Sequence, residues 1–211
     1  MGLTISIAAL WLFGGLTEEV LHRAPLTRVD ITILDWFHSN STEAGIRIFE
    51  AISFLGSPFL LSTLGTVLII YFLIRREWIF LTSWIAALIG AGILDWFLKE
   101  AVHRERPAYA VAILQGHSFS FPSGHSLASL VAYGMTSYFV IVLWTKKSSS
   151  RTPVIFLAAI LVIAIGISRL YLGVHYFTDV VAGYAAGAVW LSACVTGAEI
   201  ARRQPAAQTS E

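Results

Sequence analysis

Three short polar motifs, each inside or next to an apolar segment, contain the residues of this sequence that are suited to chemistry. Together they supply three cations, two histidines and a carboxylate. The motifs are Lys99-x6-Arg106-Pro107, Pro122-Ser123-Gly124-His125 and Ser168-Arg169-x5-His175-x3-Asp179. Cations bind phosphate oxygens, and histidines transfer protons or attack as nucleophiles. This set of residues is therefore suited to moving a phosphoryl group without a metal ion.

The cations of the motifs are predicted to bind a phosphate. Arginine offers a planar fork and lysine a compact charge, and Lys99, Arg106 and Arg169 come from different segments that could surround one phosphate. For each residue alone, the alternative is a long side chain that extends from a helix end to the membrane surface. Arg104 either joins the site or faces lipid headgroups. Asp95 either pairs with Lys99 and orients it or marks the membrane surface.

The Pro-Ser-Gly-His motif predicts the start of a helix. Proline suits a first helical turn, and the free backbone N–H groups of that turn bind anions. Gly124 leaves room for a phosphate to approach, and Ser123 adds a hydroxyl donor; an ordinary helix cap is the alternative. A histidine pKa near 6.5 allows His125 to act as the general acid that protonates the leaving oxygen.

His175 and Asp179 are four residues apart, a spacing that places both on one face of a helix. The carboxylate can then bind one ring nitrogen and leave the other free to attack. A simple surface pair is the alternative, but this pair opens an apolar segment, where charged groups are costly and more often functional. We therefore predict that His175 is the nucleophile and that Asp179 orients it.

The composition is that of a membrane protein. The 211 residues are 56% hydrophobic and 13% charged, whereas soluble domains are about 45–50% apolar and about 25% charged. A net charge of +1 gives no basic surplus for nucleic acid, so membrane lipids are the expected partners. The single cysteine, Cys194, excludes an intrachain disulfide and is expected to pack in an apolar run. The sequence carries no signal for an oligomeric state.

Apolar runs divide the chain into predicted spans. A helix needs about 20 residues to cross a bilayer; five runs qualify, and a shorter one is expected to end before Glu18 and Glu19, without the features of a signal peptide. The six spans lie at residues 3–16, 58–74, 78–98, 124–144, 153–168 and 177–198. The sequence therefore predicts an all-α integral membrane protein, with six transmembrane helices in one bundle that forms a single domain over 1–211. We expect a disordered tail at 204–211.

Six spans would place all three motifs at the same end of the bundle. Seven Lys and Arg residues fall at each end, but three of those at the motif end belong to the motifs. Because Lys and Arg favour the cytoplasmic side, we expect the termini inside and the motifs on the extracytoplasmic face. The polar segment 17–57 is predicted to form one or two amphipathic helices on that outer surface.

In these motifs the sequence resembles the type 2 phosphatidic acid phosphatases, which share an active site with the vanadium haloperoxidases. The family pattern is Lys-x6-Arg-Pro, Pro-Ser-Gly-His and Ser-Arg-x5-His-x3-Asp, and all eleven fixed positions are present in order. The resemblance implies a phosphohistidine on His175, orientation by Asp179 and protonation of the leaving group by His125, without a metal or another cofactor. It implies phosphate binding by Lys99, Arg106, Ser123, Gly124 and Arg169.

The function expected from this resemblance is hydrolysis of a lipid phosphate or lipid pyrophosphate. Phosphatidate, phosphatidylglycerophosphate and undecaprenyl pyrophosphate all remain open as substrates. A phosphotransferase that uses an acceptor other than water would form the same phosphohistidine. A lipid transporter or lipid-binding protein without catalysis is a third possibility, since intramembrane charges alone would permit it. Against the third, the charged residues gather at one surface and do not form a path through the midplane.

Overall fold

The residues that the computed structural model describes, which are 2–22, 25–111, 119–144 and 151–208, form helices joined by short connections. Six of these helices are long and apolar enough to cross a membrane. In order, the helices are α1 (Gly2–Leu21), α2 (Leu26–Ser39), α3 (Glu43–Phe54), α4 (Pro58–Arg75), α5 (Trp78–Val102), α6 (Ala108–Val111), α7 (Gly124–Leu143), α8 (Thr152–Tyr171) and α9 (Phe177–Gln208). The prediction of an all-α chain with six spans is confirmed.

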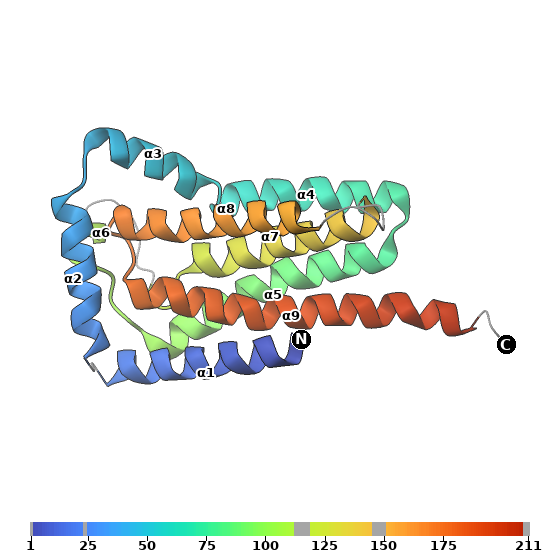
Figure 1. The fold of residues 1–211 in the computed structure, drawn as a ribbon, viewed down its shortest axis with the longest axis horizontal. Helices are drawn as coiled ribbons and strands as arrows, with labels where there is room; N and C mark the ends of the chain where they lie inside the picture. The colour runs from blue at the N-terminus through green and yellow to red at the C-terminus, as the bar shows by residue number, and fades with distance from the viewer. Residues whose placement is uncertain (1, 23–24, 112–118, 145–150, 209–211) are drawn as a thin grey trace.

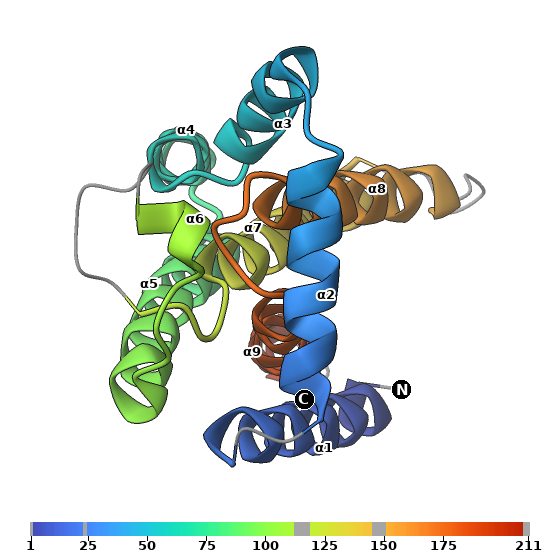
Figure 2. The same cartoon turned by 90° about the vertical axis from the view of Figure 1, so that its left-hand side faces the viewer.

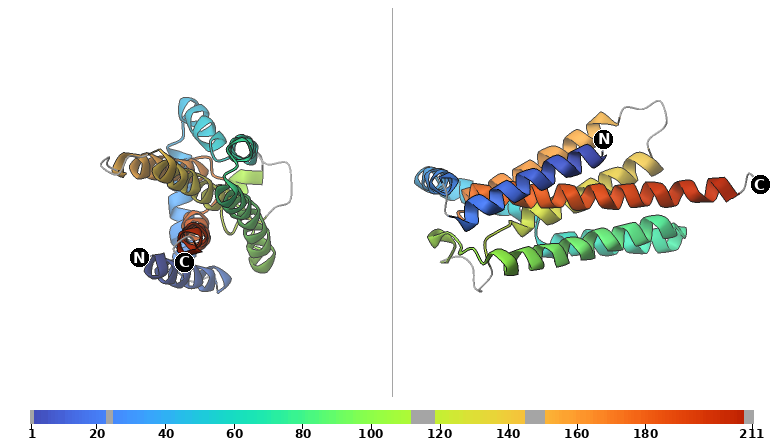
Figure 3. Two further views of the ribbon diagram at one scale, coloured as in Figure 1. Left: turned by 90° about the vertical axis from the view of Figure 1, so that its right-hand side faces the viewer. Right: turned by 90° about the horizontal axis from the view of Figure 1, so that it is seen from below.

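The long helices run side by side, and the shorter ones gather at one end of the bundle (Figure 1). Seen from that end, α2 crosses the ends of the long helices and α3 leans outward (Figure 2). Both chain termini lie away from it (Figure 3). The segment 17–57 thus contributes two short helices. The ends of α5 and α8 and the starts of α7 and α9 meet under α2, so all three motifs converge as predicted.

The first helix is longer than the sequence suggested. Glu18 and Glu19 were expected to end it, but α1 continues to Leu21. The reason is that Leu16 and Val20, one turn apart, are buried against Phe121, so one face stays apolar while Glu18 points outward. At the other end of the chain, α9 continues to Gln208, past the expected start of the tail at 204, and residues 209–211 lie outside the described residues. So do Lys146 and Lys147 of the charge balance.

Two glycines let α9 approach α7 closely. A Cβ atom at Gly183 would lie 2.6 Å from the backbone oxygen of Ser123, and one at Gly187 would lie 3.0 Å from the backbone oxygen of Leu127. Small residues four apart are a common way for membrane helices to pack backbone against backbone. The close approach allows the Ser123 amide to donate to the backbone oxygen of Asp179 at 2.9 Å. The helix packing therefore joins the second and third motifs.

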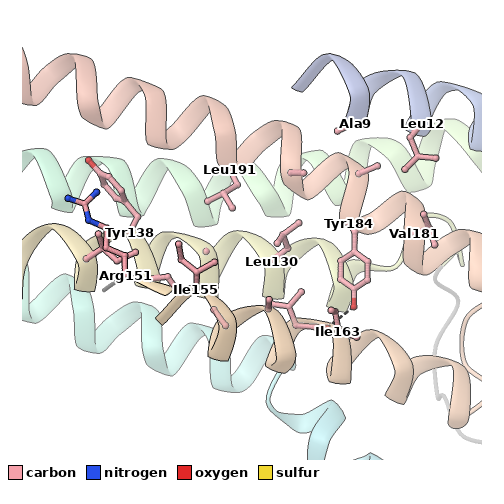
Figure 4. A pocket seen from close by; sticks show the side chains of 18 residues that line it. Ala9, Leu12, Leu130, Tyr138, Arg151, Ile155, Ile163, Val181, Tyr184 and Leu191 are labelled. Carbon is pink, nitrogen blue, oxygen red and sulfur yellow. Dashed lines mark hydrogen bonds between the residues drawn. The ribbon is translucent and has the colours of Figure 1, made fainter. Parts of the chain in front are cut away.

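A cavity of about 740 Å³ lies between α1, α7, α8 and α9, away from the motif end. Aliphatic side chains such as Leu130, Ile155 and Leu191 line it (Figure 4). Among its lining residues only Arg151 is charged, and the Tyr184 hydroxyl already donates to the backbone oxygen of Val162 at 2.6 Å. The cavity is therefore mostly apolar, and its lining lacks the cluster of cations and histidines that phosphoryl transfer needs.

Replacing Gly183 by alanine is expected to destabilise the bundle. The added methyl must push the Ser123 backbone away, and such overpacking costs about 1–3 kcal/mol. Gly197→Ala on the same helix is the matched control, because its Cβ would meet no atom within 4 Å. Thermal unfolding in detergent should give a midpoint lower by several degrees for Gly183→Ala and unchanged for Gly197→Ala. Equal midpoints would contradict the packing argument.

Candidate active site

The structure brings all eight residues predicted for the site to the end of the bundle under α2. Lys99 lies in the last turn of α5, Arg169 in the last turn of α8, and His125 in the first turn of α7. Arg106 and His175 lie in the connections that follow α5 and α8. Each of the eight residues is linked to at least one other of them by a hydrogen bond, a close contact or a shared cavity.

His175 is held from both sides of its ring. Its Nδ1 lies 3.4 Å from Oδ2 of Asp179, and that oxygen also accepts from the Tyr176 amide at 2.9 Å and from the Ser120 hydroxyl. Its Nε2 lies 3.3 Å from a guanidinium nitrogen of Arg106. Because a guanidinium can only donate, Nε2 is an acceptor and Nδ1 carries the proton. The lone pair is therefore on Nε2, the nitrogen that the sequence interpretation assigns to attack, and it faces Arg106.

Burial decides the charge of this histidine. The His175 side chain is 2% exposed, and burial lowers its pKa to about 4. The hydrogen bond and the charge of Asp179 work in the opposite direction, while the cations of Arg169 and Arg106 lower the pKa further. The ring is therefore neutral at neutral pH, which is the form in which an imidazole attacks an electrophile.

Arg169 is a buried cation with hydrogen-bonding capacity to spare. Its side chain is 8% exposed, and one guanidinium nitrogen donates to the hydroxyl of Ser53 on α3. Its Nε is buried and has no hydrogen-bond partner among the described residues. Buried donors are nearly always paired, so an acceptor such as a phosphate oxygen would complete this site. Arg106, whose pKa burial lowers, also donates to the backbone oxygen of Val174 at 3.0 Å.

Lys99 pairs with Asp95, which decides between the two interpretations of that carboxylate. The Lys99 Nζ and Asp95 Oδ2 atoms are 2.6 Å apart. Gly124 packs directly against the pair, since a Cβ there would lie 2.9 Å from Asp95 Oδ2 and 3.0 Å from Lys99 Nζ. The missing side chain at Gly124 thus makes room for the ion pair. A further role in phosphate approach remains a prediction.

Ser123 caps α7. Its buried Oγ accepts from the Ser126 amide at 3.4 Å and from the Ser126 hydroxyl at 3.0 Å. The cap described in the sequence as an alternative is therefore present. It leaves the hydroxyl hydrogen of Ser123 available, so a cap and a phosphate donor are compatible at this position.

Two cavities meet at His125. One, of about 420 Å³, lies between α4, α5 and α7, with Lys99, Arg106 and His125 among its polar lining and Leu61 and Leu88 among its apolar lining. The other, of about 760 Å³, lies beneath α2 and α3 and is also lined by Arg169 and Ser53. A molecule with an anionic end and a hydrocarbon end would find both environments here.

Sequence reasoning missed several residues of this site. Ser53 and Ser120 gave no signal, since serines are common and neither belongs to a motif. Arg104 was left with two interpretations, and the structure supports the first: a guanidinium nitrogen lies 2.5 Å from Oδ1 of Asp179. Its side chain is therefore part of the site and is not directed at lipid headgroups.

Six membrane-length helices with a buried site of cations and histidines at one end define a multi-pass membrane protein suited to an anionic lipid. Residues 76–203 of this chain match the sequence model of the PAP2 superfamily. The chain belongs to this superfamily, that of the type 2 phosphatidic acid phosphatases, and the resemblance seen in the motifs is confirmed.

Two relatives and one solved structure show how far the similarity extends. Phosphatidylglycerophosphatase B of Bacillus subtilis is 34% identical over 145 residues, which cover 67% of this chain and 69% of the relative. Lipid A 1-phosphatase of Rhizobium johnstonii is 35% identical over 52% of this chain, which spans about half (46%) of that protein. The crystal structure of a transmembrane PAP2-type phosphatidylglycerolphosphate phosphatase from Bacillus subtilis superposes with a TM-score of 0.82 at 28% identity, covering 91% of this chain and 94% of that one.

We expect the His175 ring to remain neutral at pH 5, well below the ordinary histidine pKa of 6.5. Histidine-selective ¹⁵N NMR in detergent would measure this, with His175→Gln identifying the signal. In Asp179→Asn the pKa of His175 should fall further, because the carboxylate favours the charged ring. Titration of His175 near pH 6.5 would contradict the burial argument.

Proposed function

We propose that this lipid phosphatase hydrolyses its substrate through a phosphohistidine on His175, without a metal ion. The observation that carries the proposal is the geometry of the ring. Asp179 holds Nδ1 and burial keeps the ring neutral. Its Nε2 faces Arg106, which together with Lys99 and His125 lines the adjoining cavity.

In the first step, the Nε2 lone pair of His175 attacks phosphorus and the bond from phosphorus to the leaving oxygen breaks. His125 donates a proton to that oxygen, so the lipid leaves as an alcohol from a monophosphate or as a lipid phosphate from a pyrophosphate. In the second step, water attacks the phosphohistidine and gives a proton to His125, and the P–N bond breaks. Inorganic phosphate leaves, and both histidines return to their starting states.

The cations supply the charge that a metal supplies in other phosphatases. Lys99, Arg106 and Arg169 would contact the phosphoryl oxygens from different sides, and the start of α7 with Ser123 and Gly124 would add N–H and hydroxyl donors. The unpartnered Nε of Arg169 supports this arrangement. The charges are fixed before substrate binds, so little reorganisation is needed in the transition state.

The surroundings of the site favour an amphiphilic substrate. The cavity between α4, α5 and α7 is lined by the cations Lys99 and Arg106 and by aliphatic side chains such as Leu61 and Leu88, which suits a phosphate on a hydrocarbon tail. The names of the relatives, phosphatidylglycerophosphatase and lipid A 1-phosphatase, point to lipid phosphates as well. Phosphatidate, phosphatidylglycerophosphate and undecaprenyl pyrophosphate are the substrates to compare. From the Lys and Arg balance we place the site on the extracytoplasmic face.

Purified protein should release inorganic phosphate from at least one lipid of this panel, and EDTA should leave the rate unchanged. His175→Ala should abolish release because no phosphohistidine can form. His103→Ala is the matched control, since this exposed histidine lies at the same end of the bundle and contacts Glu100 and the Phe119 ring. Full activity in His175→Ala would refute the nucleophile assignment, and loss of activity in EDTA would refute the metal-free mechanism. Transfer of a labelled phosphoryl group to an acceptor other than water would indicate a phosphotransferase. A wild-type protein without any activity would indicate a lipid-binding protein.

His125→Asn should slow cleavage in proportion to how poor the leaving group is. A lipid alcohol needs a proton to leave, so we expect a loss of about 10²–10⁴-fold, the usual contribution of a general acid. The leaving group of p-nitrophenyl phosphate departs without a proton, so its rate should fall much less. Steady-state kinetics on both substrates would test this. Equal losses would show that His125 acts by binding phosphate and not as the acid.

A further inference from the structure

We propose that Asp30 and Arg104 are positioning residues for the reaction: Asp30 holds Arg104, Arg104 fixes Asp179, and Asp179 aims His175. The inference rests on the proposed role of His175. It adds a residue of the surface helix α2 and a cation outside the fixed positions of the three motifs.

Arg104 bridges two buried carboxylates. Its two terminal nitrogens lie 2.7 Å from Oδ2 of Asp30 and 2.5 Å from Oδ1 of Asp179. The Asp30 and Asp179 side chains have no exposed surface, and that of Arg104 is 12% exposed. A buried charge without a partner is strongly destabilising, so neither carboxylate can leave the guanidinium at low cost. Burial works to lower the pKa of Arg104, but both carboxylates raise it, and the net pKa is above the ordinary value.

The bridge gives the two oxygens of Asp179 separate tasks. Oδ1 is bound by Arg104, while Oδ2 faces Nδ1 of His175 and accepts from the Tyr176 amide. A carboxylate is planar, and the guanidinium is a rigid fork. Fixing Oδ1 therefore fixes the rotation of the carboxylate and the direction in which Oδ2 points. The same guanidinium lies over the Tyr176 ring, 4.1 Å from its centre, so Arg104 is held on two sides.

Asp30 connects this bridge to α2. It lies on the inner face of α2, where Leu34, one turn later, is also buried. Its carboxylate accepts from the backbone amide of Thr178 at 2.9 Å and from the Thr178 hydroxyl at 2.6 Å. Asp30 thus satisfies donors in the first turn of α9, where a negative charge is favourable. The helix that crosses the end of the bundle (Figure 2) is thereby fixed to the turn that carries Asp179.

These contacts distinguish Arg104 from the cations proposed to bind phosphate. Both terminal nitrogens of Arg104 are bonded to Asp30, Asp179 and the Thr178 hydroxyl. Arg104 also lines neither of the two cavities that meet at His125. We therefore expect its loss to change how fast the bound substrate reacts and not how tightly phosphate binds.

The test compares Arg104→Gln with Arg106→Gln, each with purified protein in detergent and a lipid phosphate as substrate. Arg104→Gln should lower kcat by about 10- to 100-fold, the scale on which a misplaced reacting group acts. KM and the inhibition constant of inorganic phosphate should stay within about twofold of the wild type. Arg106→Gln should raise both. Arg104→Lys, which keeps the charge but loses the fork, should recover part of the loss.

The test of Asp30 uses Asp30→Asn, with Asp35→Asn on the same helix as the matched control. Asp35 is exposed and, among the described residues, accepts a hydrogen bond from the Tyr109 hydroxyl at 3.3 Å, so its variant should keep the wild-type kcat. Asp30→Asn should lower kcat at unchanged KM. In the ¹⁵N spectrum it should also lower the pKa of His175, because a less fixed Asp179 supports the charged ring less. If Arg104→Gln fails to fold, Arg104→Lys and Asp30→Asn carry the test.

Three results would overturn the proposal. If Arg104→Gln raises KM and the phosphate inhibition constant as Arg106→Gln does, Arg104 is a phosphate ligand. If both positioning variants unfold at lower temperature but keep the wild-type kcat and His175 pKa, the bridge is only structural. If His175→Ala is fully active, the proposed mechanism itself fails. An inactive His175→Ala with a fully active Arg104→Gln would reject the positioning role alone.

Discussion

Asp179 is a carboxylate with no exposed surface, and it lies at the start of a membrane-length helix. Because water cannot reach this charge, other groups of the protein must stabilise it. Arg104, the Ser120 hydroxyl and the Tyr176 amide do so. Arg104 and Ser120 lie 75 and 59 residues from Asp179 in the chain, and they can reach it only if the helix ends meet. The charge of Asp179 therefore constrains where α5 ends and where α7 and α9 begin. The same charge gives His175 a fixed orientation, so stability and chemistry depend on one group.

The backbone makes this meeting possible before any side chain does. Gly183 and Gly187 let the backbones of α9 and α7 come close together, and the Ser123 amide then donates a hydrogen bond to the Asp179 carbonyl. In a bilayer, helices gain little from hydrophobic burial against one another, so close packing and hydrogen bonds decide their arrangement. The charged end and the glycine contact are thus two parts of one solution. The glycines bring the helices near, and the buried charges fix their register.

Much of this architecture could be predicted from the sequence, because its signals are local. Apolar runs predict membrane helices, and the spacing of His175 and Asp179 predicts their pairing. The end of α1 was wrong because Leu16 and Val20 find their partner in Phe121, about one hundred residues away. Ser53 and Asp30 were missed for the same reason. Ser53 lies 116 residues from Arg169 and Asp30 lies 148 residues from Thr178, and no local pattern reports such contacts.

Arg104 and Arg106 show most clearly what only the structure can assign. The two residues are alike in charge and only two positions apart, yet one is bonded to Asp30 and Asp179 and the other faces Nε2 of His175. In a medium of low dielectric constant, the attraction between a cation and the nearest carboxylates is strong. Arg104 is thereby removed from the set available to substrate, whereas Arg106 lines the cavity that it shares with Lys99 and His125. The division of tasks between the arginines follows from where the buried carboxylates lie.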